Sequence, residues 1–126
     1  MKKIIHTKKA PSAIGPYNQA VLIDNMLYTS GQIAIDPKNG TLKTSDIREE
    51  TKQVMENLKA ILNEVDMNFS NVIKVTIFIS SMDNYSEINE IYASYFNEKN
   101  APARETVEVS RLPKSVHIEI SMIASF

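Results

Sequence analysis

Hydrophobic residues recur at helical spacing in one long segment between residues 46 and 65 of the chain. The apolar positions 47, 54, 55, 58, 61, 62 and 65 fall on one face, and charged residues lie mostly on the other. Asp46 precedes this stripe, and Glu49 lies three residues after Asp46, which is the spacing of an N-terminal capping box. The pattern predicts an amphipathic helix whose apolar face needs a sheet to cover it.

A second helix is predicted for residues 84–97. Asn84 and Glu87 again have the spacing of an N-terminal cap, and Ala101-Pro102 ends the segment because the residue before a proline disfavours helical angles. The apolar stripe of this helix consists of Tyr85, Ile88, Tyr92, Tyr95 and Phe96.

Six short segments have the composition and alternation of β-strands. Asp24-Asn25 separates two of them and suits a two-residue hairpin turn. The element order β-β-β-α-β-α-β-β predicts one α+β domain over residues 1–126, a mixed sheet with both helices on one face. The predicted strands are residues 3–7, 20–23, 26–30, 72–79, 104–109 and 116–124.

Alternation within the last two strands predicts which side chains face the helices. In the last strand, Ile118, Ile120 and Met122 point one way and Glu119 the other. In the strand before it, we expect Val107 and Val109 to face the helices, and Arg104, Thr106 and Glu108 to face away. The second face would then mix Arg104 and Glu119 with apolar groups such as Phe78. A small sheet of this kind usually buries that face against another subunit, so we expect a homo-oligomer.

Composition narrows the classes of function. A chain of 126 residues with 43% hydrophobic and 23% charged residues has the profile of one globular domain. Its 14 basic and 15 acidic residues give a net charge of -1, which argues against a nucleic-acid binder held mainly by phosphate contacts. No cysteine is present, so disulfides, thiolate metal sites and cysteine nucleophiles are excluded. We expect no membrane span, no signal peptide and a cytoplasmic setting.

Arg104 and Glu119 are the strongest candidates for chemistry. Arg104 follows Ala101-Pro102 and opens a strand, and a guanidinium in a concave site binds a carboxylate through two parallel hydrogen bonds. The alternative is an ordinary ion pair with Glu105, Glu108 or Glu119. Glu119 lies within an apolar strand, where a half-buried carboxylate can act as a general base. The alternative is an edge-strand glutamate that faces solvent.

Four further residues carry weaker signals. Tyr17 could supply a ring wall and a hydroxyl, and Ser30-Gly31 could offer backbone N–H groups to an anion. Asn89 lies on the polar side of the second helix. Each of these also fits an ordinary turn, cap or surface position. His6 and His117 have no metal-ligand spacing, and no phosphate-binding or cofactor motif is present, so we expect neither a metal nor a cofactor.

Four motifs together resemble the reactive intermediate deaminase family, also called the RidA/YjgF family. They are residues 13–17 (AIGPY), 28–32 (YTSGQ), 101–104 (APAR) and 107–113 (VEVSRLP), and the resemblance covers the whole chain. It implies a chorismate-mutase-like fold and a homotrimer with three sites in the clefts between subunits. It also implies hydrolysis of 2-imino acids or their enamine tautomers, such as 2-iminobutyrate and 2-aminoacrylate, to 2-keto acids and ammonia without a cofactor.

The resemblance also implies roles for single residues. Arg104 would hold the substrate carboxylate, and Glu119 would position and activate the hydrolytic water. Asn89 would shape the cleft, and Thr106 stands where many members have a cysteine, which places it among the substrate-binding positions. The remaining positions would line the site or make polar contacts near the imine and carboxylate: Tyr17, Ser30 and Gly31.

Three other functions remain open on the sequence alone. The same cleft could bind keto acids or other small carboxylates and regulate a partner without turnover. Relatives also carry the label of RNA-cleaving translation inhibitor, against which the net charge and the lack of a basic aromatic groove argue. A holdase-like chaperone has no specific signal in the sequence.

Overall fold

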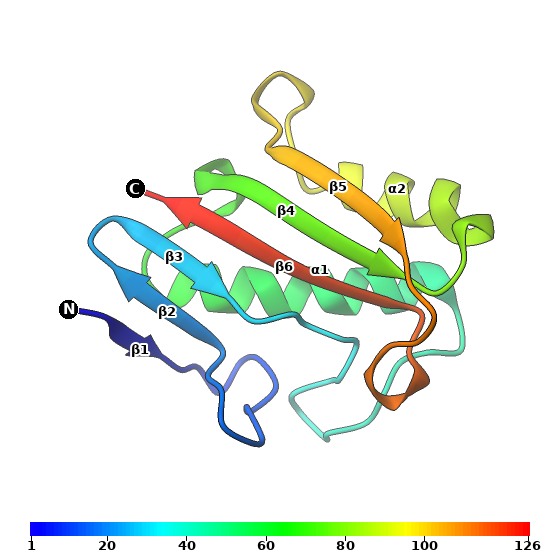
Figure 1. Ribbon diagram of the computed structural model, residues 1–126, viewed down its shortest axis with the longest axis horizontal. Coiled ribbons are helices and arrows are strands. Elements are labelled where there is room, and N and C mark those ends of the chain that lie inside the picture. The colour runs from blue at the N-terminus through cyan, green and yellow to red at the C-terminus, as the bar shows by residue number, and fades with distance from the viewer.

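One mixed sheet with two helices on one of its faces makes up the fold (Figure 1), as the computed structural model of all 126 residues has it. The strand order is β1-β2-β3-β6-β4-β5, and β4 and β5 form the one parallel pair. This confirms the predicted α+β class and element order. The strands are β1 (Lys3–Ile5), β2 (Ala20–Ile23), β3 (Met26–Thr29), β4 (Val72–Ile79), β5 (Ala103–Glu108) and β6 (Ile118–Ser125), and the helices are α1 (Ile47–Glu64) and α2 (Tyr85–Ala93).

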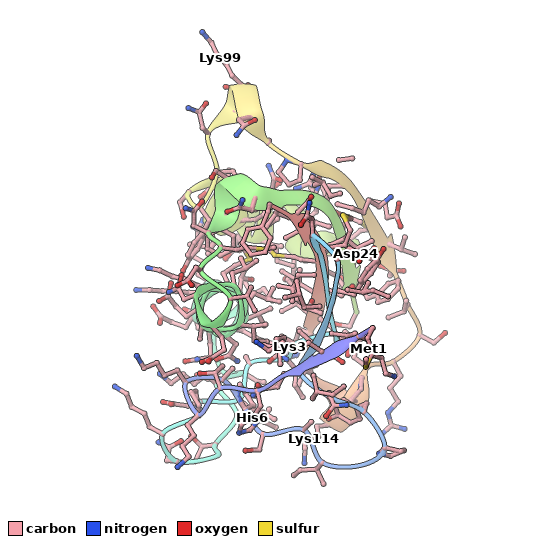
Figure 2. The ribbon with its side chains drawn as sticks, turned by 90° about the vertical axis from the view of Figure 1, so that its left-hand side faces the viewer. Met1, Lys3, His6, Asp24, Lys99 and Lys114 are labelled. Carbon is pink, nitrogen blue, oxygen red and sulfur yellow. The ribbon has the colours of Figure 1, made fainter.

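Helix α1 forms as its periodicity predicts. The carboxylate of Asp46 accepts hydrogen bonds from the backbone N–H groups of Arg48 and Glu49, at 2.8 and 3.2 Å, and so caps the helix. The middle of its apolar stripe, which includes Leu58 and Ile61, is fully buried against the sheet, and the two ends of the stripe, Ile47 and Val65, are partly buried. Figure 2 shows α1 along one side of the sheet, which leaves the opposite face without a helix.

Helix α2 ends earlier than the sequence predicts. Residues 84–97 do not form one helix, because α2 stops at Ala93 and the hydrogen bonds of the next turn span three residues instead of four. The hydroxyl of Ser94 donates to the carbonyl of Ile91 at 2.6 Å and tightens this turn. Phe96 then packs edge-on against Phe69, with ring centres 5.3 Å apart.

The register of the central strands sets the two faces of the sheet. Ile118, Ile120 and Met122 of β6 are buried on the helix side, as predicted. Glu119 pairs with Phe78 of β4 on the open face, and Val107 of β5 lies beside Phe78.

The prediction for β5 is wrong, because its two faces are the other way round. Arg104 lies beside Val75 and Thr106 beside Ile77, two buried residues, so both side chains point toward the helix side. Val107 points to the open face and is 43% exposed. The physical reason is that β5 is an edge strand. On the helix side of this edge, Asn89 and Tyr85 of α2 offer oxygen atoms that accept hydrogen bonds from Arg104.

Neither helix combines the length and the apolar character that crossing a bilayer requires.

Candidate functional site

A cavity of about 640 Å³ opens on the face of the sheet that no helix covers. Three segments form it: the loop between β1 and β2, the chain that follows β3, and the turn before β6, where Lys114 lies (Figure 2). Four of the residues predicted for the site line this cavity together: Tyr17, Ser30, Gly31 and Glu119.

The chain after β3 leaves the sheet and rejoins it beside β6. The hydroxyl of Thr29 accepts the backbone N–H of Met122 at 2.9 Å, and Gln32 and Ile120 exchange two backbone hydrogen bonds of 2.8 and 3.1 Å. Between these anchors, Gly31 lies directly against the side chain of Glu119.

The absence of a side chain at Gly31 makes room for this contact. A Cβ atom at this position would lie 2.7 Å from the carboxyl carbon of Glu119 and 2.9 Å from its Oε1. The neighbouring Ser30 is fixed by its backbone, since its N–H donates to the carbonyl of Gln19 at 2.9 Å, and its hydroxyl donates to the carbonyl of Asn18.

Glu119 is half-buried and makes no hydrogen bond or ion pair with any other side chain of the chain. Burial raises the pKa of this carboxyl above its ordinary value. A carboxylate with free lone pairs and a raised pKa can bind water and exchange protons with a ligand.

The start of the loop that carries Tyr17 is held by a residue that the sequence did not single out. The side-chain amide of the buried Gln19 donates to the carbonyls of Thr7, Ala10 and Pro11 at 3.0, 3.2 and 2.8 Å. The Oε1 atom of Gln19 accepts the backbone N–H of Thr7 at 2.7 Å. Tyr17 itself is 52% exposed at the rim of the cavity. The one signal for Gln19 in the sequence is that it is a polar residue directly before a predicted strand.

Arg104 belongs to a second cluster, on the helix side of the sheet. Its Nη1 donates to Oδ1 of Asn89 at 2.6 Å, and its Nη2 donates to the hydroxyl of Tyr85 at 2.8 Å. The guanidinium carbon lies 4.9 Å from the ring centre of Tyr92. Sequence reasoning assigned both tyrosines to the apolar stripe of the helix and missed their contacts with Arg104.

The structure contradicts the alternative in which Arg104 forms an ordinary ion pair. Glu105 pairs with Lys74 at 2.8 Å, and a carboxylate oxygen of Glu108 accepts the backbone N–H of Met82 at 2.8 Å. Arg104 has no carboxylate partner in the chain. Its positive charge is therefore available to an anion.

Two hydroxyl groups near this cluster are shielded from solvent and have no hydrogen-bond partner: those of Thr106 and Tyr92. Burial raises the pKa of Tyr92 to about 12, against a smaller opposing effect from the positive charge of Arg104. Tyr92 therefore stays protonated and neutral beneath the guanidinium.

The predicted site residues thus fall into two groups that one chain does not bring together. Arg104, Asn89 and Thr106 lie on the helix side, whereas the cavity with Glu119 lies on the open face. The expectation that Arg104 and Glu119 share one face of neighbouring strands is wrong on both counts. Strand β4 lies between β5 and β6, and Arg104 lies beside Val75 on the helix side whereas Glu119 lies beside Phe78 on the open face. Nowhere in the chain do three His, Asp or Glu side chains gather as a metal site would require.

The fold and these two clusters define a small α+β protein with a free carboxylate in one cavity and a free guanidinium at the sheet edge. The family model described as Endoribonuclease L-PSP matches residues 7–126. The chain belongs to this family, which is also known as the YjgF or RidA family.

Curated relatives cover almost the full length of the chain. A RutC family protein of Pyrococcus horikoshii is 51% identical over 124 residues, which is 98% of each chain. The human 2-iminobutanoate/2-iminopropanoate deaminase is 44% identical over 124 residues, or 98% of this chain and 90% of the relative. The crystal structure of E. coli TdcF with bound serine superposes with a TM-score of 0.92 at 41% identity and covers 98% of both chains.

Proposed function

We propose that this protein hydrolyses 2-imino acids and their enamine tautomers, such as 2-iminobutyrate and 2-aminoacrylate, to 2-keto acids and ammonia. One observation carries the proposal: the chain has a guanidinium, Arg104, without a carboxylate partner, and a half-buried carboxylate, Glu119, without a cationic partner. A mammalian relative at 44% identity bears the name of this activity.

The active site is completed by a second copy of the chain. Because Arg104 and Glu119 lie on opposite faces of one sheet, a substrate that touches both requires Arg104 from one subunit and the Glu119 cavity from its neighbour. The open face is suited to such a contact, since Ile4, Tyr28 and Val107 are 46, 45 and 43% exposed on it. A homotrimer with three such sites is the assembly we propose.

Arg104 binds the carboxylate of the substrate. A guanidinium carries five N–H groups, and two of those of Arg104 are taken by Asn89 and Tyr85. The remaining N–H groups suffice for a two-point contact with a carboxylate, which also fixes the orientation of the adjacent C=N bond. Bound serine in E. coli TdcF is a small carboxylate of the same kind.

Glu119 moves the protons. As water attacks the carbon of the protonated imine, Glu119 takes a proton from the water and the C=N electron pair goes to nitrogen. Glu119 then gives this proton to the amine, and it takes the hydroxyl proton as the C–N bond breaks and C=O forms. Ammonia carries that last proton away as ammonium. A pKa raised by burial suits a group that must both accept and donate protons.

The other residues shape the site. Tyr17 forms a wall of the cavity, and Ser30 and Gly31 present backbone groups toward the imine and carboxylate ends of the substrate. On the neighbouring subunit, Asn89 holds Arg104 in place and Thr106 flanks it on the same strand. No cofactor takes part in this mechanism.

A coupled assay tests the proposal. Threonine dehydratase generates 2-iminobutyrate in solution, semicarbazide competes for the imine, and an active deaminase lowers the yield of semicarbazone. We expect the wild-type protein to be active and Arg104→Lys to lose at least about 100-fold, because lysine keeps the charge but not the planar fork.

The matched control is Arg48→Lys, since Arg48 pairs with Glu87 and Glu90 on the helix surface. This control should keep wild-type activity. A wild-type protein that binds 2-ketobutyrate but never lowers the semicarbazone yield would instead be a carboxylate-binding regulator. Sedimentation as a single species of monomer mass would contradict the shared site.

The family description gives a second candidate, cleavage of RNA. Sugar-phosphate binding draws on positive charge, and the chain has a net charge of -1. Incubating the same preparation with single-stranded RNA separates the two candidates: we expect intact RNA at protein concentrations that hydrolyse the imine, whereas cleavage that survives Arg104→Lys would support the second.

A further inference from the structure

We propose that the hydroxyl of Tyr85 is a further carboxylate-binding group beside Arg104. The inference rests on the proposed function, because it concerns the ligand of the same guanidinium. Tyr85 is the first residue of α2, and its hydroxyl oxygen accepts a hydrogen bond from Nη2 of Arg104 at 2.8 Å.

The proton of this hydroxyl has no acceptor within the chain. Tyr85 accepts from Arg104, and its O–H donates to no other group. A phenol has one proton to donate as well as lone pairs to accept with. The side chain is 37% exposed, so the proton is directed toward solvent or a ligand.

An anion on the guanidinium would come within reach of this donor. Tyr85 and the free N–H groups of Arg104 converge on the same space, since one is bonded directly to the other. The two N–H bonds of Nη2 diverge, so a carboxylate that accepts from the free one would bring its other oxygen toward the Tyr85 hydroxyl. That oxygen can receive a second, charge-assisted hydrogen bond from the hydroxyl.

The other tyrosines of this region cannot take this role. Tyr95 already uses its proton, because its hydroxyl donates to Oε2 of Glu56 at 2.8 Å. Tyr92 is buried, and it contacts the guanidinium through the face of its ring. Tyr85 is thus the one tyrosine near Arg104 with a free proton and an exposed side chain.

Tyr85 is also not needed to hold Arg104 in place. The hydrogen bond from Nη1 to Asn89, at 2.6 Å, and the ring of Tyr92, 4.9 Å from the guanidinium carbon, fix Arg104 independently. Loss of the Tyr85 hydroxyl should therefore lower the affinity for a carboxylate and leave the guanidinium in position.

Binding of the product 2-ketobutyrate and of its neutral amide, 2-oxobutanamide, tests this inference. In Tyr85→Phe we expect the Kd of 2-ketobutyrate to rise about tenfold, the usual effect of losing a hydrogen bond to a charged group, and the Kd of the amide to change by less than about twofold. In the deaminase assay KM should rise by the same factor, with kcat nearly unchanged.

Tyr95→Phe is the matched control, because it removes a phenol hydroxyl that Glu56 occupies. We expect it to leave both Kd values and the KM unchanged. Two results would overturn the inference: unchanged binding of 2-ketobutyrate in Tyr85→Phe, or an equal loss for the keto acid and the amide, which would assign Tyr85 to packing alone.

The same measurements separate this inference from the proposed function. A wild-type protein that hydrolyses the imine while Tyr85→Phe keeps its KM would reject the role of Tyr85 only. A wild-type protein that binds 2-ketobutyrate in a Tyr85-dependent way but shows no turnover would reject the deaminase only.

Discussion

Arg104 and Glu119 point to opposite faces of the sheet, with strand β4 between their own strands. Arg104 lies beside Val75 on the helix side, and Glu119 lies beside Phe78 on the open face. Each group is also without a charged partner in its own chain. Under the proposed function a single chain therefore supplies two half-sites, and contact between copies would join them into one.

Gly31→Ala should strongly impair the proposed deaminase activity. The added Cβ would lie 2.7 Å from the carboxyl carbon of Glu119, so the carboxylate must move. We expect kcat to fall by about 100-fold or more, because a displacement of about 1 Å at a reacting group costs this much. The imine assay measures it.

Gly40→Ala is the control for this substitution. A Cβ at Gly40 meets nothing within 4 Å, but its positive φ of 73° makes alanine strained there. We expect it to lose about 1 kcal/mol of stability and to keep full activity. Equal activity of the two alanine variants would show that the contact between Gly31 and Glu119 has no role in turnover.

The pH profile of turnover should report the environment of Glu119. In the proposed mechanism the group acts as a base in its ionised form, and burial raises its pKa above the ordinary 4.5. We therefore expect kcat to fall on the acid side with a midpoint above 4.5, and this limb to vanish in the residual activity of Glu119→Gln. An acid limb that persists unchanged in Glu119→Gln would assign the titration to another group.

The ionised side chain of Glu119 should also lower the stability of the folded protein at high pH. Because its folded pKa lies above its unfolded pKa, the folded state favours the neutral form, and this advantage is lost as pH rises through the folded pKa. We expect Glu119→Gln to have the higher Tm at pH 8, and the difference to disappear below pH 4.5. A Tm difference that is independent of pH would contradict this.

Glu50 should be a major contributor to stability without touching the site. Its carboxylate is fully buried and binds both the backbone N–H and the ring Nδ1 of His117, at 2.8 and 2.7 Å. Glu50→Ala leaves this N–H without its acceptor, and we expect a loss of about 2–3 kcal/mol in urea unfolding.

The neighbouring Glu49 provides the comparison, because it is exposed on the first turn of α1. We expect Glu49→Ala to cost less than about 1 kcal/mol. Equal losses for the two glutamates would mean that the hydrogen bonds to His117 add nothing to stability.

The sequence predicts most of the fold because its strongest hydrophobic patterns are those that burial in the core requires. The stripe of α1 and the alternation of β6, with Ile118 and Ile120 inward, are imposed by the core and appear plainly in the sequence. The orientation of β5 was missed because neither of its faces is apolar: Arg104 and Thr106 alternate with Glu105 and Val107. Without a core face, alternation cannot tell inside from outside.

The site was predictable to a similar extent. Motif positions such as Ser30 and Glu119 do meet in one cavity. Tyr85 was missed because its place in a helical apolar stripe conceals its hydroxyl, and Gln19 was missed because its bonds to a loop have no local pattern. The division of the site between two faces depends on which way β5 faces, and the alternation of its residues does not settle that.

Co-expression of two inactive variants tests the central claim most directly. Subunits with Arg104→Lys and subunits with Glu119→Gln, carrying different affinity tags, are purified as mixed oligomers and assayed for imine hydrolysis. If each site takes Arg104 from one copy and Glu119 from its neighbour, every mixed trimer has both native groups in one of its three sites, and about a third of wild-type activity returns. Activity no higher than that of the two separate variants would contradict a site shared between copies.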